Sequence, residues 1–171
     1  MPSLDNMMLR QIIMDHYENP RNRELVEDDS YKKVNMDSET CIDNIDIQAK
    51  IENGVIEDIR FDGEACAICT SSTSIMTELL IGKTIDEARV IIENYMNMIF
   101  EKDYDPEILE EAIAFYNTHK QANRIKCATL GWKGITQLID ESEKEETHGK
   151  RISFRYARHS RLISTGAHKN T

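Results

Sequence analysis

Long apolar runs are missing from this sequence of 171 residues. No stretch approaches the roughly 18 residues that a membrane-spanning helix needs, so we expect no membrane span. The opening residues, MPSLDNMMLRQ, also lack the basic and then apolar order of a signal peptide. With 40% hydrophobic and 30% charged residues, the composition is that of an ordinary globular domain. These features predict a soluble, cytoplasmic protein.

Basic residues are scarce relative to acidic ones. Lys and Arg total 21 and Asp and Glu total 31, which gives a formal net charge of −10. This balance argues against nucleic-acid binding, because phosphate contacts need clustered Lys and Arg. From Lys150 onward the chain is basic and contains no acid, so the remainder is more acidic than the total suggests. Such a body suits a partner with a basic surface, or simply keeps the protein in solution.

Cysteines are few as well. Four cysteines in an intracellular protein of this size do not indicate a disulfide framework. They are metal ligands, reactive thiols or small buried hydrophobic side chains. The choice among these three decides the function.

Hydrophobic periodicity predicts a helix followed by antiparallel strands in the first half of the chain. The helix covers roughly residues 4–17 and ends at Asn19-Pro20, and residues 21–40 are interpreted as a polar surface loop. Alternating apolar residues predict strands over 45–51 and 55–61, joined by a tight turn at Asn53-Gly54. Asp62-Gly63 is expected to end the second strand, and a further short strand is expected over 65–69.

The second half of the chain is predicted to be helical. Helices are expected over 70–80, from Thr84 to about Ile99, after Asp105-Pro106, and over 123–139. Thr84 and Glu87 have the spacing of a capping box. The order of elements predicts an α+β fold, a small antiparallel β-sheet packed against a group of α-helices. We expect one domain over 1–142 and a charged, mobile tail over 143–171.

Cys41, Cys66 and Cys127 each fall at the edge of a predicted element, where separate segments of a chain can converge. Asp43 would face the same way as Cys41 if the chain there is extended. Three thiolates and one carboxylate form a tetrahedral set suited to Zn²⁺. Spacing alone leaves the alternative open that some of these thiols fill the core, since no zinc-ribbon pair is present.

Three blocks of sequence carry a resemblance to a known family. They are MLRQIIMDHYENPRN, GVIEDIRFDGEAC and RIKCATLGWKGI. In this order they resemble the SufU-type members of the NifU/IscU family over about residues 4–140. The helical insert between Gly82 and Arg124 is also similar to SufU, and Lys126 stands where IscU proteins have a histidine.

The resemblance implies an IscU/NifU-N-like sandwich and a metal site of Cys41, Asp43, Cys66 and Cys127. It implies a zinc-dependent protein that accepts persulfide sulfur from a cysteine desulfurase of the SufS type, with Cys41 as the acceptor. Arg124 would pair with Asp43 or steady the site, or would simply be a solvated arginine at the start of a helix. Downstream cluster-assembly proteins are the other expected partners.

The alternative within the family is an IscU-type scaffold that assembles a [2Fe–2S] cluster on the same residues. Whether the protein counts as an enzyme depends on this choice: a sulfurtransferase is one and a scaffold is not.

Two features depart from the family pattern. Ile42 replaces a glycine between the first cysteine and the aspartate, and Cys69 is an additional thiol. We interpret Cys69 as a core thiol, with a redox role as the alternative, and His16 as a packed, hydrogen-bonded residue.

Overall fold

The computed structural model describes residues 5–39 and 41–169, with side chains up to residue 145. The chain divides into two compact units, Met1–Leu138 and Ile139–Thr171. The first unit holds the sheet, most of the helices and all four cysteines. The second is the C-terminal part of a long helix. The predicted boundary at residue 142 and the mobility of the tail remain predictions.

The sheet has three antiparallel strands in the order β1-β2-β3. They are β1 (Lys32–Asp37), β2 (Asn44–Glu52) and β3 (Val55–Glu64). On the central strand, Ile45, Ile47 and Ala49 are all buried, and Ile47 lies opposite Phe61 of β3. The alternating apolar residues of this strand therefore lie on the face of the sheet that packs against the helices. The β2–β3 hairpin turns at Asn53-Gly54 as predicted, with positive φ at both residues.

The predicted loop over 21–40 contains the edge strand β1, so that part of the interpretation was wrong. Only two of its six residues, Val34 and Met36, are apolar, and both are half-buried. An edge strand has one pairing neighbour and one solvated side, so its hydrophobic pattern is weak. A second error concerns β3, which does not end at Asp62 but continues through Gly63, paired with Ile45, to Glu64.

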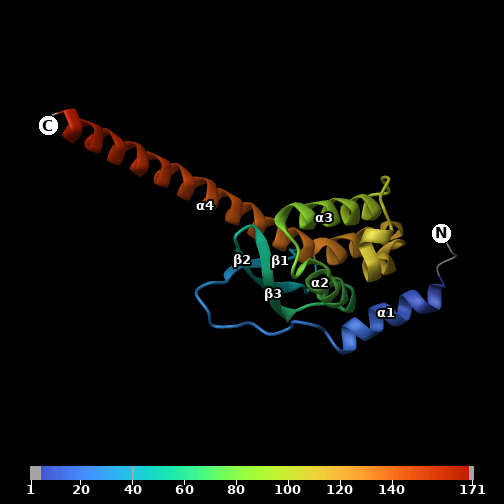
Figure 1. The fold of residues 1–171 in the computed structure, drawn as a ribbon. Coiled ribbons are helices and arrows are strands. Elements are labelled where there is room, and N and C mark those ends of the chain that lie inside the picture. Colours follow the sequence, from blue (N-terminus) through green and yellow to red (C-terminus); the bar gives the residue numbers. More distant parts are fainter. Residues whose placement is uncertain (1–4, 40, 170–171) are drawn as a thin grey trace. The chain divides into compact units, whose positions relative to one another are not determined.

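Six helical segments complete the described chain. They are α1 (Asn6–Glu18), α2 (Ala67–Leu80), α3 (Ile85–Ile99), η1 (Glu107–Phe115), η2 (Thr118–Lys120) and α4 (Ala122–Lys169). Figure 1 shows α2 between the sheet and α1, and α2 packs against both β3 and α1. The predicted capping box is present, since the Thr84 hydroxyl accepts from the Glu87 N–H and the Glu87 carboxylate accepts from the Thr84 N–H. The α+β class is confirmed.

Three predicted helices differ from those observed. Helix α2 starts at Ala67, because the Cys66 side chain caps it, and this replaces the short strand expected over 65–69. Residues 107–115 form 3-10 turns interrupted at Glu110, where φ is 46°. Helix α4 continues past Ile139 to Lys169. The sequence just after Asp140 is rich in Glu and Lys, which favour a helix, and no proline follows to break it. Within the described residues, no helix combines the length and apolar character needed to cross a bilayer.

Trp132 of α4 connects three helices within the core. Its ring is fully buried and stacks on Tyr95 of α3 at a centroid distance of 3.8 Å. The indole N–H donates to the Ser72 hydroxyl at 3.0 Å, and that hydroxyl lies 2.7 Å from the Ala128 carbonyl, which accepts its proton. Helices α2, α3 and α4 are therefore tied together by one aromatic stack and its hydrogen bonds.

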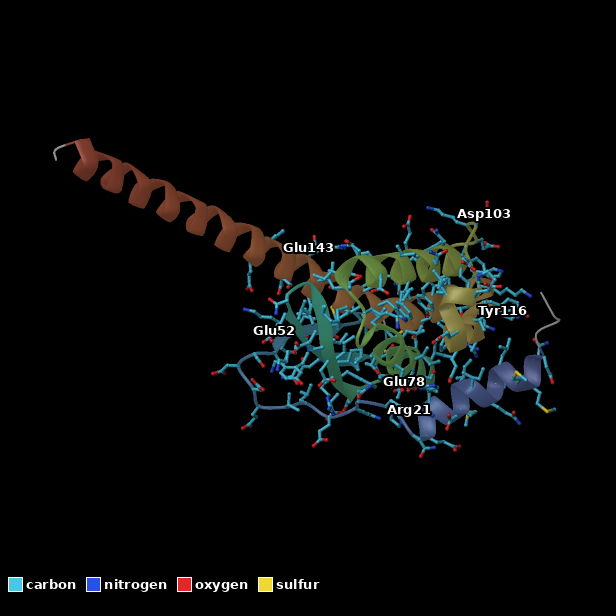
Figure 2. The ribbon with its side chains drawn as sticks, viewed as in Figure 1. Arg21, Glu52, Glu78, Asp103, Tyr116 and Glu143 are labelled. Carbon is cyan, nitrogen blue, oxygen red and sulfur yellow. The ribbon has the colours of Figure 1, made fainter. Side chains whose placement is uncertain are left out.

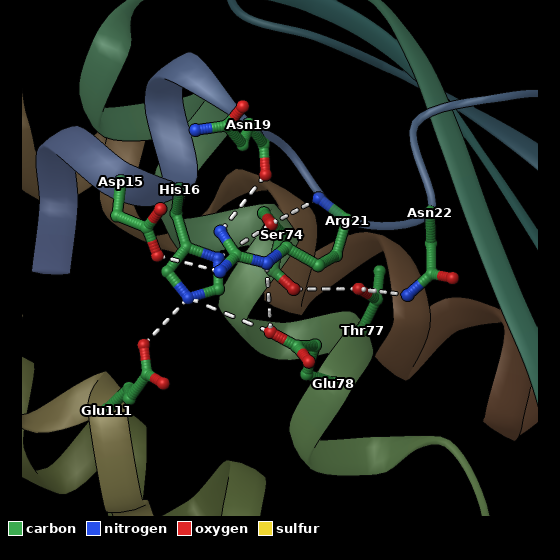
Figure 3. Close-up of polar contacts among 9 residues, drawn as sticks. All are labelled: Asp15, His16, Asn19, Arg21, Asn22, Ser74, Thr77, Glu78 and Glu111. Atoms are coloured by element: carbon green, nitrogen blue, oxygen red, sulfur yellow. Dashed lines mark hydrogen bonds and ion pairs between the residues drawn. The ribbon is translucent and has the colours of Figure 1, made fainter.

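His16 ties α1 to the helical layer (Figure 3). Its ring is buried, with Nδ1 2.8 Å from the Ser74 hydroxyl and Nε2 2.7 Å from a Glu111 carboxylate oxygen. The Ser74 oxygen also accepts from the Arg21 backbone N–H at 2.8 Å. Arg21 lies 3.5 Å from the Glu78 carboxylate through its Nε. His16 is thus a packed, hydrogen-bonded residue, as predicted.

Gly63 lies on β3 directly beside the segment that follows Asp43. Its φ is +132°, and a Cβ at this position would lie 2.3 Å from the Asn44 carbonyl oxygen. Gly54 also has a positive φ of +74°, but a Cβ there would meet nothing within 4 Å. Gly63→Ala should therefore lower the free energy of unfolding by about 1–3 kcal/mol more than Gly54→Ala does. Urea unfolding of both variants measures this difference, and equal losses would contradict it.

Candidate metal centre

Cys41 and Asp43 lie on the turn that joins β1 to β2. The Ser38 N–H donates to the Asp43 carbonyl at 2.8 Å, and the Cys41 N–H donates to the Ser38 carbonyl at 3.4 Å. These two hydrogen bonds close the turn that carries Cys41. The sequence did not predict a role for Ser38, because only its backbone atoms form these hydrogen bonds and because strand β1 before it was not predicted.

Cys66 is the N-cap of α2. Its sulfur accepts from the Cys69 N–H at 3.4 Å. The Cys66 N–H donates to Asp43 Oδ1 at 2.7 Å, and Cys66 Sγ lies 3.8 Å from Asp43 Oδ2. The buried carboxylate therefore meets the positive end of a helix, where negative charge is favoured. One side chain links the β1–β2 turn to the start of α2.

Cys127 completes the cluster from the second turn of α4. Its Sγ lies 4.0 Å from Cys41 Sγ, and ligand atoms of Cys41, Asp43 and Cys127 all lie within 4.8 Å of one another. Burial raises the pKa of the Cys127 thiol, and the neighbouring Asp43 and Cys66 raise it further. Without a bound cation, the protonated thiol is therefore strongly favoured at this position.

Two of the donor separations are close to those of a tetrahedral zinc site. For Zn–S bonds of about 2.3 Å, a tetrahedron separates neighbouring ligand atoms by about 3.8 Å. The separation of 4.0 Å between the Cys41 and Cys127 sulfurs is close to this value, and Cys66 Sγ lies 3.8 Å from Asp43 Oδ2. The group of ligand atoms within 4.8 Å of one another contains Cys41, Asp43 and Cys127 but not Cys66. Three thiols and one buried carboxylate fit Zn²⁺, and sulfur donors disfavour Mg²⁺ and Ca²⁺.

Ile42 and Arg124 flank these four residues. Ile42 does not take a positive φ and is 69% exposed, so the turn as observed needs no glycine at this position. Arg124 is exposed at the start of α4, and within the described part of the chain its side chain forms no ion pair with Asp43. Its supporting role remains a prediction.

Cys69 is not one of the four predicted ligands and, like Cys127, is buried. It is fully buried on the first turn of α2, and burial raises its pKa far above the usual range of a thiol. Neighbouring Asp43 and Cys66 add to this shift. These properties agree with its interpretation as a core thiol.

Comparison with known sequences places the chain in a family. Residues 8–147 match the family described as the NifU-like N terminal domain. The chain belongs to this family. It is 38% identical over 137 residues to the zinc-dependent sulfurtransferase SufU of Bacillus subtilis, covering 80% of this chain and 92% of that protein. It is 31% identical over 138 residues to the iron–sulfur cluster assembly scaffold protein IscU of Streptococcus pyogenes, covering 80% and 86%.

Solved structures of the family have the same fold. One is described as an iron–sulfur cluster assembly scaffold protein for the SUF system from Fervidobacterium islandicum. It superposes with a TM-score of 0.68 at 29% identity, covering 78% of this chain and 97% of that one. The N-terminal part of a NifU-like protein from Brucella abortus gives a TM-score of 0.69 at 21% identity, covering 82% and 99%. The resemblance read from the three sequence blocks is confirmed.

The burial of the thiols predicts their order of reaction once metal has been removed with a chelator. Cys41 and Cys66 are half-buried, whereas Cys69 is fully buried with a raised pKa, so its thiol stays protonated at pH 8. Iodoacetamide should alkylate Cys41 and Cys66 well before Cys69. Peptide mass spectrometry at successive times measures this order, with urea-unfolded protein as the control in which all four thiols react. Alkylation of Cys69 as fast as Cys41 in folded protein would overturn this assignment.

Proposed function

We propose that this protein accepts sulfur for iron–sulfur cluster assembly in the manner of a SufU-type sulfurtransferase. The observation that carries the proposal is the convergence of Cys41, Asp43 and Cys127 on one point, with Cys66 bonded to Asp43. The relative from Bacillus subtilis, named a zinc-dependent sulfurtransferase, supports this choice. Lys126, which stands where IscU proteins have a histidine, favours it over the scaffold alternative.

Cys41, Asp43, Cys66 and Cys127 would hold the zinc ion. When bound, the ion would keep its thiol ligands deprotonated and would fix the β1–β2 turn. Asp43 is the ligand already held in place, since the Cys66 N–H donates to one of its oxygens. Its second oxygen faces the Cys66 sulfur at 3.8 Å.

Cys41 is the proposed sulfur acceptor because of its position. It lies on a turn and is half-buried, whereas Cys127 is buried on a helix, so a partner reaches Cys41 more easily. The Cys41 thiolate would attack the outer sulfur of a persulfide on the partner. A bond forms between Cys41 Sγ and that sulfur, the S–S bond of the partner persulfide breaks, and the partner cysteine leaves as a thiolate. The sulfur is transferred without any net redox change.

The partner in this step would be a cysteine desulfurase of the SufS type, which carries such a persulfide. Downstream cluster-assembly proteins would then receive the sulfur from Cys41. We place this activity in the cytoplasm, where thiols stay reduced. The four cysteines, none of which forms a disulfide within the described residues, support that placement.

The metal content separates the two functions considered for this site. Anaerobically purified protein should contain about one zinc per chain, and Asp43→Ala should weaken zinc binding by more than about tenfold. Asp103→Ala is the matched control, because Asp103 is exposed on the loop after α3 (Figure 2). Elemental analysis and competition with a chromophoric chelator measure both quantities. Iron with matching acid-labile sulfide would instead assign the protein as a [2Fe–2S] scaffold.

The acceptor role of Cys41 has its own test. Cys41→Ala should stay folded but should stimulate a cysteine desulfurase no more than buffer does, because the attacking thiolate is gone. Cys69→Ala is the control, since Cys69 is buried away from any partner. Sulfide release from cysteine, and mass spectrometry of the persulfide, measure transfer. An active Cys41→Ala variant would exclude Cys41 as the acceptor.

A further inference from the structure

A groove runs between α1 and the segment that leads from η1 into α4. It consists of two hollows, of about 220 Å³ and about 250 Å³. Both hollows are lined by Ile13 of α1 and by Ala114 and Asn117 of the facing segment, so they lie next to each other. Tyr116, labelled in Figure 2, belongs to this segment, and its hydroxyl donates to Asn6 of α1 at 3.5 Å.

The groove offers apolar surface to a ligand. Ile13 and Ile68 line the hollow of about 220 Å³, and each is only half-buried. Phe115 lies behind them as part of the core. A single apolar side chain of a partner would cover the exposed parts of Ile13 and Ile68, which is favourable for each area removed from water.

The charges along the groove are of one sign. Among the described residues, the charged ones that line it are Arg10, Lys120 and Arg124, and none of them is a carboxylate. All three are exposed, and within the described part of the chain none of their side chains forms an ion pair. In a protein with a net charge of −10, this is a local positive strip in an acidic surface. Such a strip attracts a negatively charged segment and repels basic ones.

One end of the groove lies beside the candidate metal centre. Ile68 is on the first turn of α2, which Cys66 caps, and Arg124 lies one turn before Cys127 in α4. A chain lying in the groove would therefore continue toward the residues that hold Cys41.

We propose that this groove binds an extended acidic segment of the cysteine desulfurase, with one apolar side chain seated on Ile13 and Ile68. Carboxylates of that segment pair with Arg10 and Lys120. This inference rests on the proposed function and adds a docking surface that is separate from the metal ligands. The groove positions the partner so that its persulfide meets Cys41, and it selects by charge and shape rather than by the reacting sulfur.

The test is the affinity of the zinc-loaded protein for the cysteine desulfurase of the same organism, measured by calorimetry. Arg10→Glu combined with Lys120→Glu should weaken the dissociation constant on the order of tenfold or more, and should reduce its dependence on salt. The matched control combines Lys33→Glu with Lys133→Glu, which makes the same change of charge on exposed residues outside the groove. Arg124 is left unchanged because it lies next to Cys127.

Each outcome decides the proposal. Weak binding by the groove variant, with wild-type affinity in the control and full zinc content in both, supports it. Equal binding by the wild-type protein and the groove variant overturns the docking site and leaves the sulfur-transfer function standing. Equal weakening in groove and control variants also overturns it, because net charge alone would then explain the effect. Failure of the wild-type protein to bind the desulfurase overturns both the groove assignment and the proposed function.

Discussion

The buried carboxylate of Asp43 is the constraint on which the candidate metal centre depends. An ionised carboxylate without solvent exposure is costly unless its oxygens are paired. The Cys66 N–H at the start of α2 satisfies one oxygen, and the other faces the Cys66 sulfur. A cation at the centre would offset the remaining cost. The backbone carbonyl of the same residue closes the β1–β2 turn, so Asp43 links the sheet to the start of α2.

The elements with strong local signals were predicted from the sequence. The alternation at Ile45, Ile47 and Ala49 indicated a strand, and Thr84 with Glu87 indicated the start of a helix. Edge strand β1 was missed because it buries little on either face. The capping of α2 by Cys66 was missed for a chemical reason, since cysteine is not a usual N-cap residue. Cys66 caps the helix because the fold places its sulfur within reach of the Cys69 N–H.

The four predicted ligand positions depended on resemblance more than on spacing. They come from three separate segments, and no local rule states that a turn, a helix cap and a second helical turn converge. In the structure Cys41, Asp43 and Cys127 lie close together, and the Cys66 N–H donates a hydrogen bond to the Asp43 carboxylate. Ile42, which departs from the family pattern, has no positive φ and is exposed to solvent. Charge along the groove could not be read from the sequence, because Arg10, Lys120 and Arg124 meet only in the folded chain.

The stacked pair of Trp132 and Tyr95 has a consequence for spectroscopy. Trp132 is the only tryptophan in the chain, and it lies on the same helix as Cys127. Its emission therefore comes from one environment, defined by the Tyr95 ring and the Ser72 hydroxyl. A loosening of α4 changes this fluorescence, whereas a rearrangement confined to the turn of Cys41 leaves it unchanged. The protein thus contains an intrinsic optical reporter that distinguishes opening of the helical layer from local movement of the turn that carries Cys41.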